Sequence, residues 1–178
     1  TIRSYKVIVE GSNWGLACNS IHFIDICAFI LKDSCYQIDF LDLGKAIPSK
    51  RKDFVEFYGS IQCKFSSSAT LELKCDDAVD VSVKVSFYSK SKTAIQTETL
   101  SFYQEQNGVN SLIHQDSFKM PFQSEMTGPL VKLLLEDGDC PLTNFKEAKS
   151  LHLPFISSLL KHYNSESNLP ENKILPIT

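Results

Sequence analysis

Apolar and polar residues alternate almost without interruption between Val55 and Phe87, and this alternation constrains the fold more than any other feature of the chain. Successive side chains of a β-strand point to opposite faces of its sheet, so the pattern predicts an antiparallel meander with one buried and one solvent-facing side. The residues of the apolar parity are Val55, Phe57, Ile61, Cys63, Phe65, Ala69, Leu71, Leu73, Cys75, Val79, Val81, Val83, Val85 and Phe87.

Shorter stretches on both sides of this segment extend the β pattern. Strands are predicted over 5–10, 36–43, 95–103 and 112–120, each ended by turn-forming residues or a break in the alternation. The stretch 20–31 is apolar on all sides, which suits either a strand buried on both faces or a buried helix. Its β-branched and aromatic content favours a strand.

The pattern becomes helical after residue 128. A short helix is predicted to open at Pro129, because proline fits the first helical turn. Asn144 and Glu147 have the spacing of a capping box and predict the start of a second helix. Pro154 predicts a kink in that helix, beyond which Leu159 and Leu160 are expected to pack inward.

The 178 residues are enough for one good core and too few for two. We therefore expect a single β-rich domain over 1–164, with strands to about 122, helices over 129–163 and a flexible tail over 165–178. Its natural packing is an antiparallel β-sandwich of C2-like or immunoglobulin-like Greek-key type with a short helical C-terminal segment. The alternative is a two-layer α+β fold with helices against one sheet.

The six cysteines bear on the cellular compartment: Cys18, Cys27, Cys35, Cys63, Cys75 and Cys140. Three of them, Cys27, Cys63 and Cys75, fall at apolar positions, where a free thiol acts as a small hydrophobic group. Reduced cysteines indicate an intracellular protein of the cytoplasm or nucleus. The alternative is a secreted protein whose even number of cysteines forms disulfides.

Residues of the types that bind metals are present, but their spacing predicts no metal site. Cys18, His22, Cys27 and Cys35 could in principle form a zinc cluster, yet a strand over 20–31 would point His22 and Cys27 to opposite faces. The aspartates near residues 76–80 and 137–139 are ordinary turn residues rather than an established calcium site.

Catalytic motifs are also missing from the sequence. It contains no Gly-x-Ser-x-Gly elbow, no Gly-x-Gly-x-x-Gly turn and no Walker loop. His114 could pair with Asp116, but no nucleophile is identifiable beside them. The sequence therefore predicts a non-enzymatic protein without a cofactor.

Six residues stand out as candidates for an interaction surface: Trp14, Lys50, Arg51, Lys52, Leu159 and Leu160. An ordinary globular composition, cysteines on the buried parity and the lack of a catalytic constellation favour a non-catalytic scaffold or adaptor domain of a larger intracellular protein, with a protein partner of unknown identity. Nucleic-acid binding is not expected of an acidic chain, and three basic residues are too few for stable membrane anchoring. The alternative is a secreted, disulfide-bonded β-sandwich that binds a protein or an apolar ligand.

Overall fold

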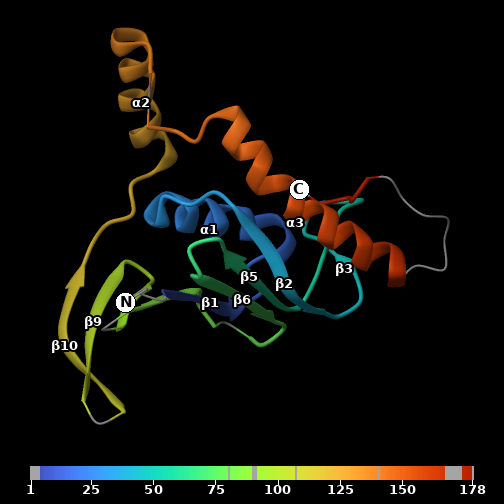
Figure 1. The fold of residues 1–178 in the computed structure, drawn as a ribbon, viewed down its shortest axis with the longest axis horizontal. Helices are drawn as coiled ribbons and strands as arrows, with labels where there is room; N and C mark the ends of the chain where they lie inside the picture. The colour runs from blue at the N-terminus through green and yellow to red at the C-terminus, as the bar shows by residue number, and fades with distance from the viewer. Residues whose placement is uncertain are drawn as a thin grey trace.

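The computed structural model describes residues 5–79, 81–89, 92–106, 108–139, 141–166 and 174–177, which form one large sheet with helices on one side (Figure 1). The strands are β1 (Lys6–Ser12), β2 (Tyr36–Leu43), β3 (Ile47–Pro48), β4 (Val55–Glu56), β5 (Gly59–Phe65), β6 (Thr70–Asp76), β7 (Lys84–Tyr88), β8 (Lys92–Gln96), β9 (Thr99–Gln106) and β10 (Val109–Ser117). The helices are α1 (Leu16–Leu31), α2 (Gln123–Asp137) and α3 (Phe145–Glu166).

The expected β-sandwich is wrong. Eight of the described strands form a single sheet in the order β10-β9-β8-β7-β1-β6-β5-β2, while β3 and β4 pair separately. This single sheet with helices on one face lies nearer to the two-layer arrangement that was the alternative. The period-2 pattern reports that one face of each strand is buried, and it cannot tell whether a second sheet or a helix covers that face.

The alternation between Val55 and Phe87 predicts the β5–β6 hairpin but not the place of β7. Strands β5 and β6 pair antiparallel, with Ile61 opposite Leu73. The next strand, β7, does not continue a meander, because β1 lies between β6 and β7 and pairs parallel with β6. Local alternation carries no information about a strand that enters the sheet from another part of the chain.

The stretch 20–31 is a helix, not a strand. Leu16, Ser20, Ile24 and Cys27 are buried at a spacing of three or four residues, which is the period of one helix face. Lys32 ends the helix in the left-handed conformation at φ 52°, and its backbone N–H donates to the carbonyl of Phe29. Packing against the sheet thus outweighs the strand preference of the β-branched residues here.

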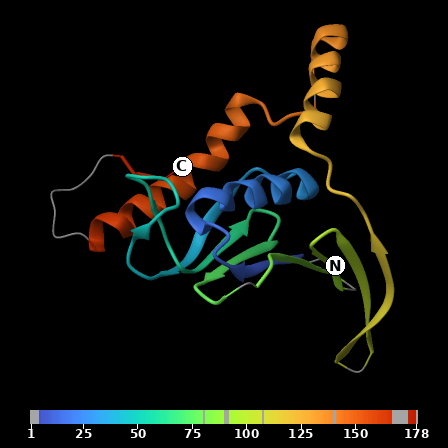
Figure 2. The ribbon, with the colours of Figure 1, turned by 180° about the vertical axis from the view of Figure 1, so that it is seen from behind.

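The hydrophobic core lies between one face of the sheet and two helices, α1 and α3, which cover it side by side (Figure 2). Its buried members are Val7, Val9, Leu16, Ala17, Ile24, Cys27, Ala28, Tyr36, Phe57, Ile61, Cys63, Phe65, Ala69, Leu71, Leu73, Cys75, Leu151, Phe155, Leu159 and Leu175. The apolar parity of β5 and β6 is therefore buried, as the sequence predicts.

Helix α3 begins as expected and continues without interruption from Phe145 to Glu166. The Asn144 side chain accepts a hydrogen bond from the Glu147 backbone N–H at 3.0 Å and donates one to its carboxylate at 2.9 Å, so the predicted capping interaction is confirmed. Pro154 lies inside the helix rather than dividing it. Leu159 is fully buried and Leu160 is half-buried against the core, as predicted.

The predicted flexible tail over 165–178 falls partly outside the described residues, which omit 167–173 and 178. Within the part described, Leu175 is buried in the core and Ile177 packs against it. The carbonyl of Pro176 also accepts a hydrogen bond from the backbone N–H of Val55 at 2.8 Å. This part of the C-terminal segment is therefore held against the domain.

Helix α2 stands apart from the core (Figure 1). It begins at Gln123, six residues before the predicted start at Pro129, because the Glu125 carboxylate accepts a hydrogen bond from the Phe122 backbone N–H at 2.7 Å. None of its residues is buried. No helix among the described residues combines the length and the apolar character needed to cross a membrane.

Candidate functional site

The outward face of α1 carries a stripe of residues that the core does not use. Cys18, His22, Asp25 and Phe29 follow one another at spacings of four, three and four residues, so they lie on one side of the helix. None of them belongs to the buried face of the helix, and Phe29 is 76% exposed. His22 is also exposed.

The first turn of α1 is held by a carboxylate from β4. The two oxygens of Glu56 accept hydrogen bonds from the backbone N–H groups of Ala17 at 2.8 Å and Cys18 at 3.0 Å. Gly15, at the N-cap position, has no side chain that could do this. Glu56 therefore supplies both the missing cap and the negative charge that a helix N-terminus favours.

Replacing Glu56 by glutamine is expected to lower the free energy of unfolding by about 1–2 kcal/mol, because one acceptor and the charge at the helix N-terminus are lost. Urea unfolding followed by circular dichroism measures this change. Glu105→Gln, at an exposed position on β9, is the matched control and is expected to change stability little. Equal stability of both variants would contradict the capping role.

A cavity of about 280 Å³ adjoins this end of α1. Its walls are ordered by three hydrogen bonds: the Trp14 indole N–H donates to the Lys74 carbonyl at 2.8 Å, and the Tyr58 hydroxyl donates to the Asn13 side chain at 2.5 Å. The Asn19 amide donates to the Trp14 carbonyl, also at 2.5 Å. Aromatic surface and fixed polar groups thus meet in one place.

Two of the basic residues singled out in the sequence line the same cavity. Lys50 and Arg51 contribute to its wall, whereas Lys52 does not. Their loop has a defined shape, because the Ser49 backbone N–H donates to the Phe54 carbonyl at 2.9 Å. The Ser49 hydroxyl in turn accepts a hydrogen bond from the Arg51 backbone N–H at 3.1 Å.

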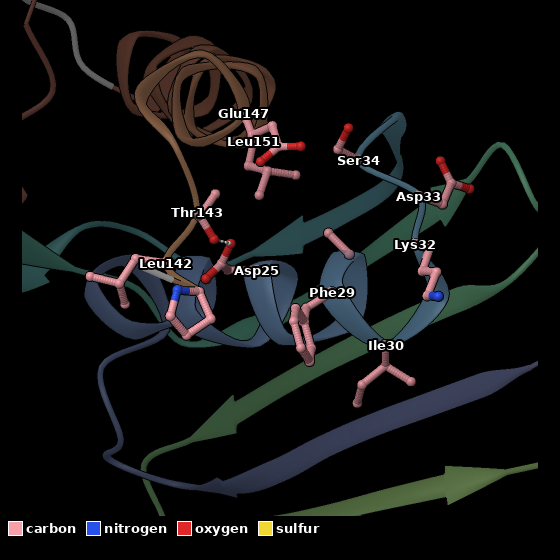
Figure 3. A pocket seen from close by; sticks show the side chains of 12 residues that line it. Asp25, Phe29, Ile30, Lys32, Asp33, Ser34, Leu142, Thr143, Glu147 and Leu151 are labelled. Atoms are coloured by element: carbon pink, nitrogen blue, oxygen red, sulfur yellow. Dashed lines mark hydrogen bonds between the residues drawn. The ribbon is translucent and has the colours of Figure 1, made fainter. Parts of the chain in front are cut away.

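A larger cavity, of about 640 Å³, lies near the other end of α1, between this helix and the start of α3 (Figure 3). Asp25 and Phe29 of the outward stripe line it. The Thr143 hydroxyl donates to the Asp25 carboxylate at 2.7 Å and so ties the segment before α3 to α1. Leu142 and Leu151 add apolar surface.

The other carboxylates of the larger cavity also hold parts of the fold together. Asp33 accepts hydrogen bonds from the Ser66 hydroxyl at 2.8 Å and the Ser67 backbone N–H at 2.7 Å. Burial acts to raise the pKa of Asp33, but these hydrogen bonds outweigh it and hold the pKa below its usual value. Glu147 is engaged in the cap of α3. Asp33 and Glu147 thus line the cavity and also stabilise the fold through these hydrogen bonds.

His22 lies on the stripe between residues that line the two cavities, and it lines neither of them itself. Cys18 lines the smaller cavity and Asp25 the larger one, and His22 is one helical turn from the first and three residues from the second. Sequence reasoning considered His22 only as a zinc ligand, on the premise of a strand. The spacing of the stripe becomes visible only when 16–31 is read as a helix.

The six sequence-derived candidates thus divide into two places. Trp14, Lys50 and Arg51 meet at the smaller cavity, with exposed Lys52 on the same loop. Leu159 lies in the core and Leu160 packs against it, so these two interaction candidates are used by the domain's own core.

The remaining predicted groups stay apart. His114 and Asp116 are paired at 2.9 Å on exposed β10 and line none of the cavities described above. Cys27 lies on the buried face of α1, whereas His22 lies on its outward face, so the zinc cluster does not form. Among the described residues, no group of three histidine, cysteine or acidic side chains could hold a metal ion.

The fold is similar to that of two crystallised dehydrogenase-type proteins. One is a dehydrogenase (MviM) from Clostridium difficile, at 13% identity and a TM-score of 0.58, matched over 89% of this chain and 54% of that one. The other, from Desulfitobacterium hafniense, is described as an NADPH-dependent oxidoreductase, at 13% identity and a TM-score of 0.55 over 90% and 55% of the two chains. The chain thus spans about half the length of these proteins.

Sequence comparison adds nothing to this likeness: no protein-family model and no curated protein matches the chain. The structural likeness nevertheless overturns three predictions made from the sequence. The secreted β-sandwich is wrong because eight of the described strands form a single large sheet. The scaffold or adaptor domain was predicted from the lack of a catalytic constellation, whereas the chain has a fold found in oxidoreductases. The prediction of a non-enzymatic protein rested on missing motifs and is corrected on the same ground.

The described residues do not themselves fit a nicotinamide dinucleotide. Such a cofactor binds its pyrophosphate on free backbone N–H groups at a glycine-rich helix N-terminus. Here the N–H groups of Ala17 and Cys18 already bind the Glu56 carboxylate, so they are not free to bind a pyrophosphate. The N-terminus of α1 therefore does not offer a dinucleotide the free N–H groups that its pyrophosphate needs.

Proposed function

We propose that this chain forms the substrate-binding part of an oxidoreductase that interconverts an alcohol and a carbonyl compound. The observation that carries this proposal is the position of His22, exposed on α1 between residues that line two cavities, in a fold similar to that of dehydrogenases. The redox cofactor would then be held by residues other than those described here.

The chemistry of such a reaction requires a group that handles a proton. When an alcohol is oxidised, the C–H and O–H bonds break and a C=O bond forms. The hydrogen on carbon leaves as a hydride to an acceptor, and the hydroxyl proton passes to a base. An imidazole can take up and return a proton near neutral pH, so a ring nitrogen of His22 is suited to that role.

Two neighbours of His22 support this assignment. Asp25 lies three residues further along α1 on the same side of the helix, and the Thr143 hydroxyl holds its carboxylate in place. Phe29 adds exposed apolar surface beyond it, which can exclude water from a bound substrate. The outward face of α1 would thus become a reaction surface rather than a docking surface for a scaffold.

An activity panel tests the proposal. The intact native protein, incubated with NADPH or NADP and a set of small alcohols, ketones and aldehydes, is expected to change nicotinamide absorbance with at least one of them. Heat-denatured protein is the control. A folded protein with no turnover on any member of a panel that spans charged, neutral and polyhydroxylated compounds would contradict it.

We also propose that the protein works inside the cell. Cys27, Cys63 and Cys75 are buried in the core as thiols, which suits a reducing compartment. Burial raises the pKa of the Cys27 thiol to about 12, and burial also raises that of Cys63. Both therefore remain protonated and unreactive in the folded state.

Alkylation with iodoacetamide without reductant tests this proposal. Exposed Cys35 is expected to react in the native protein, whereas Cys27, Cys63 and Cys75 react only after denaturation. Intact mass with peptide mapping identifies the modified positions. A native mass lower by about 2 Da per bridge, with buried cysteines that resist alkylation after denaturation, would instead indicate disulfides and an oxidising compartment.

A further inference from the structure

We propose that the smaller cavity, beside the N-terminus of α1, binds the anionic group of a small substrate, and that Lys50 and Arg51 recognise this group. The inference builds on the proposed function, because it names the chemical class of the compound that would reach His22. The shared chemistry of this class is a carboxylate or phosphate attached to a short hydroxylated carbon chain.

The charges around the cavity favour an anionic ligand. Lys50 and Arg51 line it, and within the described part of the chain neither side chain forms a salt bridge. Glu56 is the acidic residue of its lining, but both its oxygens already accept hydrogen bonds from α1. Against the single negative charge of Glu56, the two cations leave the lining with an excess of one positive charge.

The size and walls of the cavity limit the ligand. About 280 Å³ lies at or below the lower end of cavities that take drug-sized molecules, so a ligand of a few carbon atoms fits best. Trp14 and Tyr58 provide flat surfaces, and the Asn19 side chain adds polar atoms. Because the Trp14 indole N–H and the Tyr58 hydroxyl are fixed by hydrogen bonds, these walls are ordered before a ligand arrives.

The position of the cavity connects it to His22. Cys18 and Asn19 line the cavity, and His22 follows one turn later on the same side as Cys18, about 6 Å further along the helix axis. A compound held by its anionic group at Arg51 could thus extend its hydroxyl-bearing carbon along the outward face of α1. That arrangement gives the anion site a role in positioning rather than in proton transfer.

The guanidinium of Arg51 can bind either a carboxylate or a phosphate through two parallel hydrogen bonds, so geometry does not choose between them. Gluconate and sorbitol form a matched pair for this question, because they differ only in a terminal carboxylate against a hydroxymethyl group. Inorganic phosphate tests the other anion. Competition between gluconate and phosphate shows whether one site takes both.

The protein carries its own reporter, since Trp14 is its only tryptophan and lines the cavity. We expect gluconate or phosphate to change tryptophan fluorescence saturably, and sorbitol to have no effect at the same concentration. Arg51→Ala is expected to weaken anion binding about tenfold, because a charge-assisted hydrogen bond to the anion is lost. Lys50→Ala should weaken it in the same direction.

Lys52→Ala is the matched control, because Lys52 is exposed on the same loop but does not line the cavity. It removes the same charge and is expected to leave the dissociation constant unchanged. Calorimetric titration with the same ligands reads binding independently of Trp14, and thermal unfolding confirms that each variant is folded. Equal weakening by Lys52→Ala and Arg51→Ala, or no saturable binding of either anion by both methods, would overturn the proposal.

His22→Gln separates this inference from the proposed function. Anion binding that persists in this variant while the wild-type protein shows no turnover in the activity panel would leave the cavity assignment standing and reject the oxidoreductase. Turnover of neutral substrates alone, with no anion binding, would support the oxidoreductase and reject the cavity assignment.

Discussion

Replacing His22 by glutamine is expected to lower the turnover number of the intact protein by about 10²- to 10⁴-fold, the range typical of losing a general acid–base group. Glutamine keeps a polar side chain of similar reach, but it cannot take up the hydroxyl proton of an alcohol. Because His22 is exposed on α1 and outside the core, the variant should fold with nearly wild-type stability. Steady-state kinetics with the best substrate of the panel, together with thermal unfolding, measures both effects.

His152→Gln is the matched control for this experiment. His152 is also exposed on a helix, and its Nδ1 lies 2.7 Å from the Ala148 carbonyl, far along the sequence from the outward stripe of α1. Its replacement is expected to change turnover less than about twofold, since surface substitutions outside a site have small effects. Comparable losses in both variants, or none in His22→Gln, would remove His22 from the mechanism.

Phe155→Ala is expected to lower the free energy of unfolding by about 3–5 kcal/mol, which is the largest stability effect predicted for the chain. Phe155 is 2% exposed and belongs to the face of α3 that packs into the core beside Leu151 and Leu159. Truncation would leave a cavity where α3 covers the sheet. Urea unfolding at fixed pH, analysed for midpoint and slope, gives this value.

Leu153→Ala, on the same helix, tests whether burial rather than helix propensity causes the loss. Leu153 is 51% exposed, so its replacement removes little buried surface, and alanine favours helices at least as well as leucine. We expect a change below about 1 kcal/mol. A loss at Leu153 as large as that at Phe155 would mean that α3 packs in a different rotation about its axis.

Local patterns predicted the parts of the fold that depend on local physics. The alternation from Ile61 to Cys75 predicted the buried face of β5 and β6, because strand periodicity is a property of the backbone. The spacing of Asn144 and Glu147 predicted the start of α3, because a capping box needs only residues three positions apart. Each of these signals is contained within a few residues of the chain.

The features that the sequence did not reveal depend on distant contacts. The insertion of β1 between β6 and β7 joins segments about sixty or more residues apart, and no local pattern records such a pairing. The stretch 20–31 is equally apolar on all sides, so only its packing against α3 and on the sheet decides that it is a helix. That error also concealed the stripe that carries His22.

The candidate site was recognised only in fragments. Trp14, Lys50 and Arg51 stood out as unusual residues of an interaction surface, but nothing in their separation along the chain indicated one shared cavity. Glu56 received no attention, because its role requires the first turn of α1 to lie against β4. Residue types could be flagged from the sequence, whereas their assembly required the fold.

The most direct measurement of the central claim is a kinetic isotope effect on the alcohol that the activity panel identifies. The substrate is deuterated at the carbon that bears the hydroxyl group, and its turnover is compared with that of the unlabelled compound in the wild type and in His22→Gln. The account predicts slower turnover of the deuterated substrate in the wild type, since the C–H bond breaks in the reaction. It also predicts that His22→Gln lowers turnover of both substrates by the large factor given above. Turnover that is insensitive both to deuteration and to His22→Gln would contradict an oxidoreductase site on the outward face of α1.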